Sequence, residues 1–110
     1  MIIAIDFDGT LVEDQFPEIG PRVVFAFEAL KGFKEQGNEL ILWTCRKDSE
    51  KRKYLTEAIE FCRAQGIEFD AINENHPASP YAKMGNSRKI FADFYIDDRS
   101  LQPNWSEYYK

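Results

Sequence analysis

Two aspartates separated by a single residue stand directly after a short apolar run at the start of the sequence. Asp6 and Asp8 follow residues 1–5, a run rich in isoleucine that is typical of a strand buried on both faces. Alternate residues of an extended chain point the same way, so the two carboxylates can converge beyond the end of this strand. Carboxylates held close together repel each other, and the pair therefore calls for a cation or a shared proton.

The next two residues fit either a turn or a ligand site. Gly9 allows the backbone to turn sharply, and the Thr10 hydroxyl can bond to the turn or to a ligand. An Asp-x-Asp-Gly-Thr segment is also ordinary turn chemistry at the end of a strand. A second acidic pair, Asp97 and Asp98, follows another apolar run late in the sequence and favours the ligand site.

Alternating strands and helices are expected to position these acids. Four apolar runs predict strands, and apolar residues at helical spacing predict helices between the first three strands. We expect strands over 1–5, 39–43, 67–72 and 89–96, helices over 21–37 and 50–65, and loops over 11–20 and 73–88. Glycines at positions 37 and 66 are expected to end the two helices.

This alternation predicts an α/β fold built on one parallel sheet with right-handed crossovers. If Asp6 and Asp97 serve one site, the first and fourth strands must be neighbours. The strand order is then 3-2-1-4, with a switch point beside the first strand, where open sheets bind their ligands. The 110 residues are expected to form one domain, 1–110.

Composition argues against several classes of function. The formal net charge is −5 and no basic run is present, so tight binding to nucleic acid is not expected. No stretch has membrane-spanning length or the pattern of a signal peptide, and we expect a cytoplasmic protein with no membrane partner. Cys45 and Cys62 lack the spacing of a zinc site or disulfide scaffold. We expect Cys62 to be buried, and Cys45 either to pack or to line the site.

The segment DFDGTL, Asp6–Leu11, resembles the nucleophile motif of the haloacid dehalogenase superfamily. Candidates for the other three motifs follow in the right order: Thr44 after LILW, a lysine upstream of the last strand, and the pair Asp97-Asp98. The resemblance implies a three-layer, Rossmann-like domain. Because the two intervals in which this family inserts cap domains hold only ordinary elements and short loops, we expect no cap domain.

The resemblance also implies a Mg²⁺-dependent phosphatase that hydrolyses a phosphate monoester through an aspartyl-phosphate on Asp6. Asp8 is implied to act first as general acid and then as general base, and an aspartate at this position is typical of the family's phosphatases. Mg²⁺ prefers oxygen ligands. It is implied to bind Asp6, the backbone carbonyl of Asp8 and Asp97, with Asp98 either acting through water or orienting the site.

A lysine is implied to neutralise charge on the phosphoryl group, and we assign this role to Lys89. Lys83 lies in the same loop and is the alternative. Other candidate substrate contacts are side chains that follow strand ends: Thr10, Thr44, Arg46 and Arg99. For the two arginines, surface ion pairing with the many acids is the alternative.

Two other functions use the same residues, a non-catalytic metal- or phosphate-binding module and a phosphotransferase. An open site suggests, within the family, a large phosphorylated substrate or a neighbouring subunit that acts as a lid; small phosphate esters are the alternative. The tail after Arg99 contains three aromatic residues, and we expect it to dock on a protein surface. From the open site and this tail we predict a homodimer.

Overall fold

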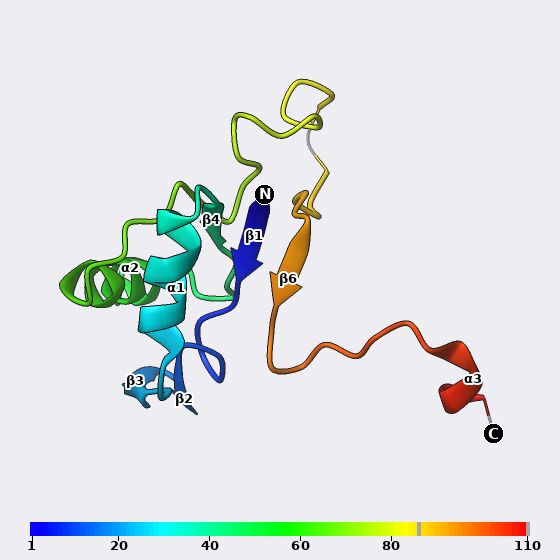
Figure 1. Ribbon diagram of the computed structural model, residues 1–110. Helices are drawn as coiled ribbons and strands as arrows, with labels where there is room; N and C mark the ends of the chain where they lie inside the picture. Colours follow the sequence, from blue (N-terminus) through cyan, green and yellow to red (C-terminus); the bar gives the residue numbers. More distant parts are fainter. Residues whose placement is uncertain (86, 110) are drawn as a thin grey trace.

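The computed structural model describes residues 1–85 and 87–109. Its centre is a parallel sheet of four strands: β1 (Ile2–Ile5), β4 (Glu39–Leu42), β5 (Ala71–Ile72) and β6 (Phe94–Ile96). The strands lie in the order β5-β4-β1-β6 (Figure 1). Counted along the chain, this is third, second, first and fourth, so the predicted order is confirmed.

Both long helices cover the same face of this sheet. α1 (Ala26–Glu35) and α2 (Tyr54–Ala64) lie on one side of β1 and β4 (Figure 1). The steps from β1 to β4 and from β4 to β5 go in one direction, and right-handed crossovers then place both helices on one face. The core between these layers is apolar and includes Ile3, Ile5, Leu40 and Leu42 from the sheet and Phe27, Leu30, Ala58 and Cys62 from the helices.

The opposite face of the sheet is covered by coil. Ile90 and Ala92, in the connection from β5 to β6, pack there against Ala4 and Ile41. Within residues 1–85 and 87–109 no helix lies in this connection. The expectation of three layers is therefore wrong for the described chain. The polar connection holds two prolines and no helical stripe of apolar residues, which explains why it crosses the face as coil.

A β-hairpin stands where the sequence suggested a loop and the start of a helix. β2 (Val12–Gln15) and β3 (Glu18–Arg22) pair antiparallel beyond the C-terminal end of β1 (Figure 1). Pro21 lies in β3 and not in the first turn of a helix. α1 begins only after Phe25, whose φ of 68° lies in the left-handed region.

Other element boundaries also differ from the prediction. α2 begins at Tyr54 instead of residue 50, because the preceding residues form a turn in which Asp48 accepts a hydrogen bond from the Thr56 backbone N–H at 2.9 Å. The third strand is paired only over its last two residues. Gly37 and Gly66 follow the helices at φ of 87° and 88°, as predicted.

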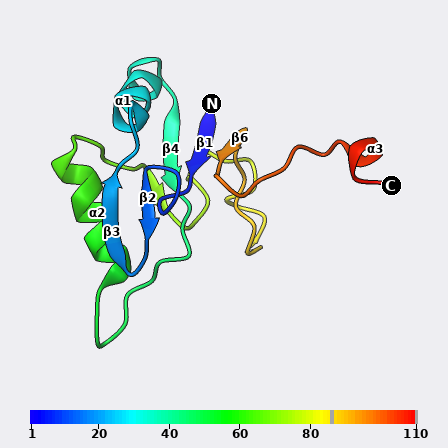
Figure 2. The same ribbon diagram turned by 90° about the horizontal axis from the view of Figure 1, so that it is seen from below.

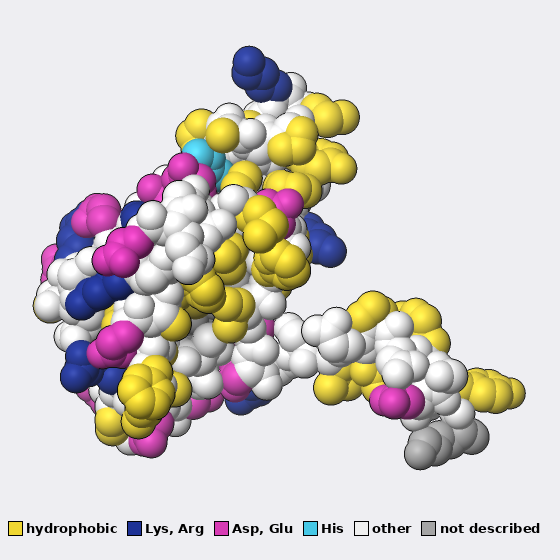
Figure 3. Space-filling view, in the orientation of Figure 1, with side chains coloured by type: hydrophobic (Ala, Val, Ile, Leu, Met, Phe, Trp, Pro, Cys, Tyr) yellow, Lys and Arg dark blue, Asp and Glu magenta, His cyan; other side chains and the backbone are white. Residues whose placement is uncertain are grey.

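The C-terminal tail leaves the body of the protein beyond β6 (Figures 1 and 2). It carries the short helix α3 (Trp105–Tyr108), and Figure 3 shows hydrophobic side chains gathered on this projection. Leu101, Trp105 and Tyr109 are 80, 74 and 89% exposed. Within the described chain the tail therefore does not dock on its own body, and docking on a partner surface stays a prediction. None of the described helices is long and apolar enough to cross a membrane.

Candidate active site at the carboxyl edge of the sheet

Three carboxylates meet at the edge of the sheet where β1 and β6 end. Oxygen atoms of Asp6, Asp97 and Asp98 all lie within 4.8 Å of one another. β1 and β6 pair in parallel, and the Asp6 N–H extends this pairing by donating to the Ile96 carbonyl at 3.0 Å. Parallel pairing brings the two acidic segments to the same edge, as the sequence predicted.

Thr10 joins the two acidic segments. Its hydroxyl lies 3.1 Å from Asp6 Oδ2 and 3.3 Å from Asp98 Oδ1, and it accepts a hydrogen bond from the Asp98 N–H at 3.1 Å. Because the hydroxyl carries one proton, it can donate to either Asp6 or Asp98. Thr10 thus organises the acids, and the structure does not support its predicted role as a substrate contact.

Gly9 allows the two acidic segments to approach each other. Its φ is +88°, and a Cβ at this position would lie 2.5 Å from Asp98 Oδ2. Any other residue would therefore collide with Asp98 as well as adopt an unfavourable backbone conformation. The glycine of the Asp-x-Asp-Gly-Thr segment is favoured by the close approach of the Asp98 side chain as well as by the turn.

The environment of Asp6 disfavours its charged form. Burial, followed by the charge of nearby Asp97, raises the pKa of Asp6 to about 6. The carboxylates form a set of hard oxygen donors with too little compensating positive charge. A small divalent cation such as Mg²⁺ fits such a set in ligand type and in charge.

Asp8 points to a different partner. Its two oxygens each accept a hydrogen bond from Arg46, at 2.8 Å from Nε and 2.8 Å from Nη2. The side chains are 16% and 1% exposed, so the pair is largely shielded from water. Bidentate pairing of this kind fixes the orientation of a carboxylate. The Asp8 side chain is not part of the three-acid cluster, which leaves only its backbone carbonyl for the predicted metal contact.

All five N–H donors of Arg46 are used within the protein. Besides Asp8, the guanidinium donates to the backbone carbonyls of Pro17 and Tyr54 at 3.3 Å and of Glu18 at 3.2 Å. No donor remains for a substrate. The prediction that Arg46 contacts substrate is therefore wrong, as is its alternative of surface ion pairing, because Arg46 is buried.

The same guanidinium ties the hairpin to the body. Pro17 and Glu18 lie at the hairpin turn, and Tyr54 begins α2. Arg46 also lies over two aromatic rings, with its Cζ 5.2 Å from the Phe7 centroid and 5.0 Å from the Phe16 centroid. The position of Asp8 thus depends on segments that are far apart in the sequence.

Thr44 lies at the end of β4, as predicted. Its N–H donates to Asn73 Oδ1 at 2.8 Å, and its hydroxyl oxygen accepts from the Arg46 N–H at 3.1 Å. The hydroxyl proton stays available to a ligand. Asn73 follows β5 with a φ of 52°. Its side-chain oxygen fixes the loop after β4 by accepting this hydrogen bond from Thr44. Its place after a strand end was the signal in the sequence, but its partner could not be deduced.

These groups line one cleft of about 360 Å³. Its walls include all four predicted aspartates together with Thr44 and Cys45, and three further side chains, Asp14, Phe16 and Arg99. Arg99 is 80% exposed, with Nη2 3.5 Å from Asp14 and Nε 3.9 Å from Asp98. Among the described residues of the cleft, Arg99 is the cation that can reorient toward an anionic ligand.

Lys89 does not line this cleft. Its Nζ lies 5.6 Å from the centroid of the Tyr95 ring, in a neighbouring hollow that also includes Asp97. Tyr95 pairs with Ala4 and so belongs to the coil-covered face of the sheet, which draws Lys89 to that side. Lys83 is exposed in the loop and is likewise not part of the cleft wall. The structure does not support the lysine assignment.

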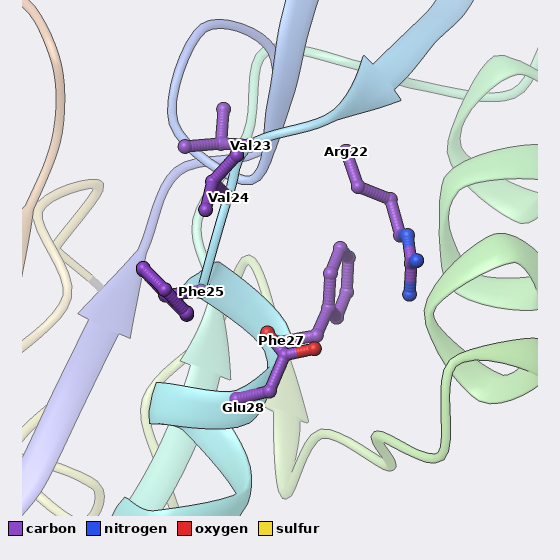
Figure 4. Close-up of a pocket in the computed structure, with 6 residues that line it drawn as sticks. All are labelled: Arg22, Val23, Val24, Phe25, Phe27 and Glu28. Atoms are coloured by element: carbon purple, nitrogen blue, oxygen red, sulfur yellow. The ribbon is translucent and has the colours of Figure 1, made fainter.

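A second hollow, near the start of α1, has a different character. It measures about 260 Å³ and is lined mainly by apolar side chains between the hairpin and α1 (Figure 4). Its charged members are Arg22, which donates to Gln65 at 2.8 Å, and Glu28. This hollow has no cluster of acids, so the cleft at the sheet edge is the candidate site.

The two cysteines are expected to differ strongly in reactivity. Cys45 is exposed in the cleft wall, which rules out the packing alternative, whereas Cys62 is buried as predicted. Burial raises the pKa of Cys62 to about 12, so its reactive thiolate is scarce at neutral pH. In the native protein, a thiol reagent such as 5,5′-dithiobis(2-nitrobenzoate) should label one thiol rapidly and the second only after unfolding. Cys45→Ser should remove the fast phase; two fast native thiols would contradict the structure.

The fold and the site together define an α/β protein with an acidic cleft at the carboxyl edge of a parallel sheet. No family model and no curated protein matches the chain. A solved structure of a conserved protein from Bacteroides thetaiotaomicron is 46% identical, with a TM-score of 0.79, and the match covers 99% of this chain and 86% of that one. The chain belongs to the same family as this conserved protein.

Proposed function

We propose that the protein is a Mg²⁺-dependent phosphatase of the haloacid dehalogenase superfamily that hydrolyses a phosphate monoester. The observation that carries the proposal is the meeting of Asp6, Asp97 and Asp98 within 4.8 Å, in a cleft that also holds Asp8. This arrangement supports the resemblance of the DFDGTL segment to the family's nucleophile motif. The proposal includes a cleft without a cap domain, since the short hairpin β2–β3 is the element between β1 and α1.

Covalent catalysis divides the reaction into two displacements. An oxygen of Asp6 attacks phosphorus while the bond from phosphorus to the ester oxygen breaks. In the reacting state one Asp8 oxygen carries a proton, which it gives to the departing oxygen, while the other oxygen still accepts from Arg46. Water then attacks the phosphorus of the aspartyl-phosphate and passes a proton to Asp8 as the Asp6 carboxylate leaves. Free phosphate and an alcohol are the products, and Asp8 regains its proton.

Other residues prepare this chemistry. Arg46 fixes the direction of the Asp8 carboxyl group, and Thr44 offers a hydroxyl proton to a phosphate oxygen. Arg99 takes the role of cation toward the phosphoryl group. Asp6, Asp97 and the Asp8 backbone carbonyl would hold Mg²⁺, with Asp98 beside them. When bound, the ion would reduce the repulsion between the acids and the phosphoryl oxygens.

Activity is expected to depend on the metal. With p-nitrophenyl phosphate and Mg²⁺ the protein should release inorganic phosphate, excess chelator should abolish the release, and added Mg²⁺ should restore it. The reason is that the acids repel a phosphoryl dianion unless a cation offsets their charge. Circular dichroism in chelator serves as the control for folding. Full turnover in excess chelator would contradict the role of the metal.

A further inference from the structure

Phe16 presents an aromatic ring to the cleft. It lies at the turn of the hairpin, is 53% exposed, and lines the cleft. The rest of its surface is supported: the Tyr54 ring lies 5.4 Å away at 47°, and Arg46 Cζ lies 5.0 Å from its centroid. A supported ring with a free side toward the cleft is a preformed apolar contact for a ligand.

The ring lines the same cleft as the group that would serve the leaving oxygen. Arg46 holds both oxygens of Asp8 at 2.8 Å and also contacts the Phe16 ring, so one guanidinium separates Asp8 from Phe16. In the proposed reaction, Asp8 gives its proton to the departing ester oxygen. Because Asp8 and Phe16 line the same cleft, the group attached to that oxygen can reach the Phe16 ring.

The charges of the cleft restrict what this group can be. Asp14 adds a further acid beside Phe16 in the cleft wall. The donors of Arg46 are fully used, and Arg99 lies within 3.9 Å of both Asp14 and Asp98. A leaving group with an additional phosphate or carboxylate would meet these acids without a cation of its own. A neutral group avoids this repulsion.

We propose that Phe16 forms a leaving-group subsite that selects phosphate monoesters of neutral aromatic alcohols. The inference rests on the proposed phosphatase function and names the substrate class of the same cleft. The ring of such an alcohol packs against Phe16 while its ester oxygen lies beside Asp8.

Benzyl phosphate and cyclohexylmethyl phosphate test this subsite, because both are primary alkyl esters of similar size and only one carries an aromatic ring. An aromatic pair contributes about 0.5–1.5 kcal/mol beyond burial, which corresponds to a roughly 2- to 12-fold preference in kcat/KM for the benzyl ester. Phe16→Leu should remove the preference and Phe16→Tyr should keep it. Phe25→Leu is the matched control, since Phe25 is 77% exposed but lies at the other hollow (Figure 4).

Binding of benzylphosphonate and cyclohexylmethylphosphonate, measured by calorimetry, separates this inference from the proposed function because no bond breaks. A preference for benzylphosphonate that Phe16→Leu removes would support the subsite even if no ester is hydrolysed, a result that would overturn the phosphatase proposal. Hydrolysis of both esters with equal kcat/KM, or a benzyl preference unchanged in Phe16→Leu, would overturn the subsite and leave the phosphatase proposal standing.

Discussion

Replacing Asp6 with asparagine is expected to abolish turnover and to prevent any phosphoenzyme from forming. Asp6→Asn keeps the shape of the side chain but removes the attacking oxygen's charge and a ligand of the proposed metal site. Asp8→Asn leaves Asp6 able to attack. The departing alcohol loses its proton donor, however, and the water that attacks in the second step loses its base. General acid–base help is typically worth about 10²–10⁴-fold, so Asp8→Asn should be slower by that order, most severely with alkyl phosphates.

Mass spectrometry separates these two roles. With an activated aryl phosphate, Asp8→Asn should accumulate a phosphoryl group on Asp6, because attack needs little acid help while hydrolysis of the intermediate needs the missing base. Glu35→Gln removes an exposed acid of α1, outside the cleft, and should behave like the natural protein. Label on another residue, or near-normal turnover by Asp6→Asn, would contradict covalent catalysis at Asp6.

Arg46→Met is expected to lower the free energy of unfolding by about 3–5 kcal/mol, a large part of the stability of a small domain. The change leaves the shielded carboxylate of Asp8 without its partner and deprives three backbone carbonyls of their donor. Arg46→Lys keeps the charge but cannot reproduce the planar fork, so it should also be destabilising. Urea denaturation followed by fluorescence measures each effect.

Two variants sharpen this measurement. Arg99→Met removes an arginine that is 80% exposed, and it should change stability by less than about 1 kcal/mol. The double variant Asp8→Asn with Arg46→Met should recover part of the loss, since no unpaired charge stays buried. Equal stability of Arg46→Met and Arg99→Met would show that the pair between Asp8 and Arg46 contributes nothing in solution.

The sheet and its acidic edge could be predicted because the relevant signals are local. Apolar runs marked the strands, and the requirement that Asp6 and Asp97 meet was enough to deduce the order that the structure confirms. The hairpin was missed because β2 and β3 are short and polar and β3 contains Pro21, so little in their own sequence favours strands. Their support comes from Arg46 and Tyr54, much further along the chain.

The errors at the site have the same origin. Arginine is rarely fully buried, and no local pattern announced that Arg46 would bind Asp8 from inside the protein. The position of Lys89 depended on which face of the sheet the chain crosses on its way to β6, and sequence order does not determine that face. Phe16 was overlooked because its role depends on a hairpin that was not expected.

The contact of Thr10 with Asp98 spans 88 positions of the chain, which has a consequence during synthesis. A nascent chain that has left the ribosome only as far as β5 carries Asp6 and Asp8 but lacks both acids that follow β6. Closing this long loop has an entropic cost that the pairing of β6 with β1 must offset. The cleft is therefore completed only after β6 and the two acids that follow it have emerged, and a nascent chain that reaches only to β5 lacks two of the three clustered carboxylates.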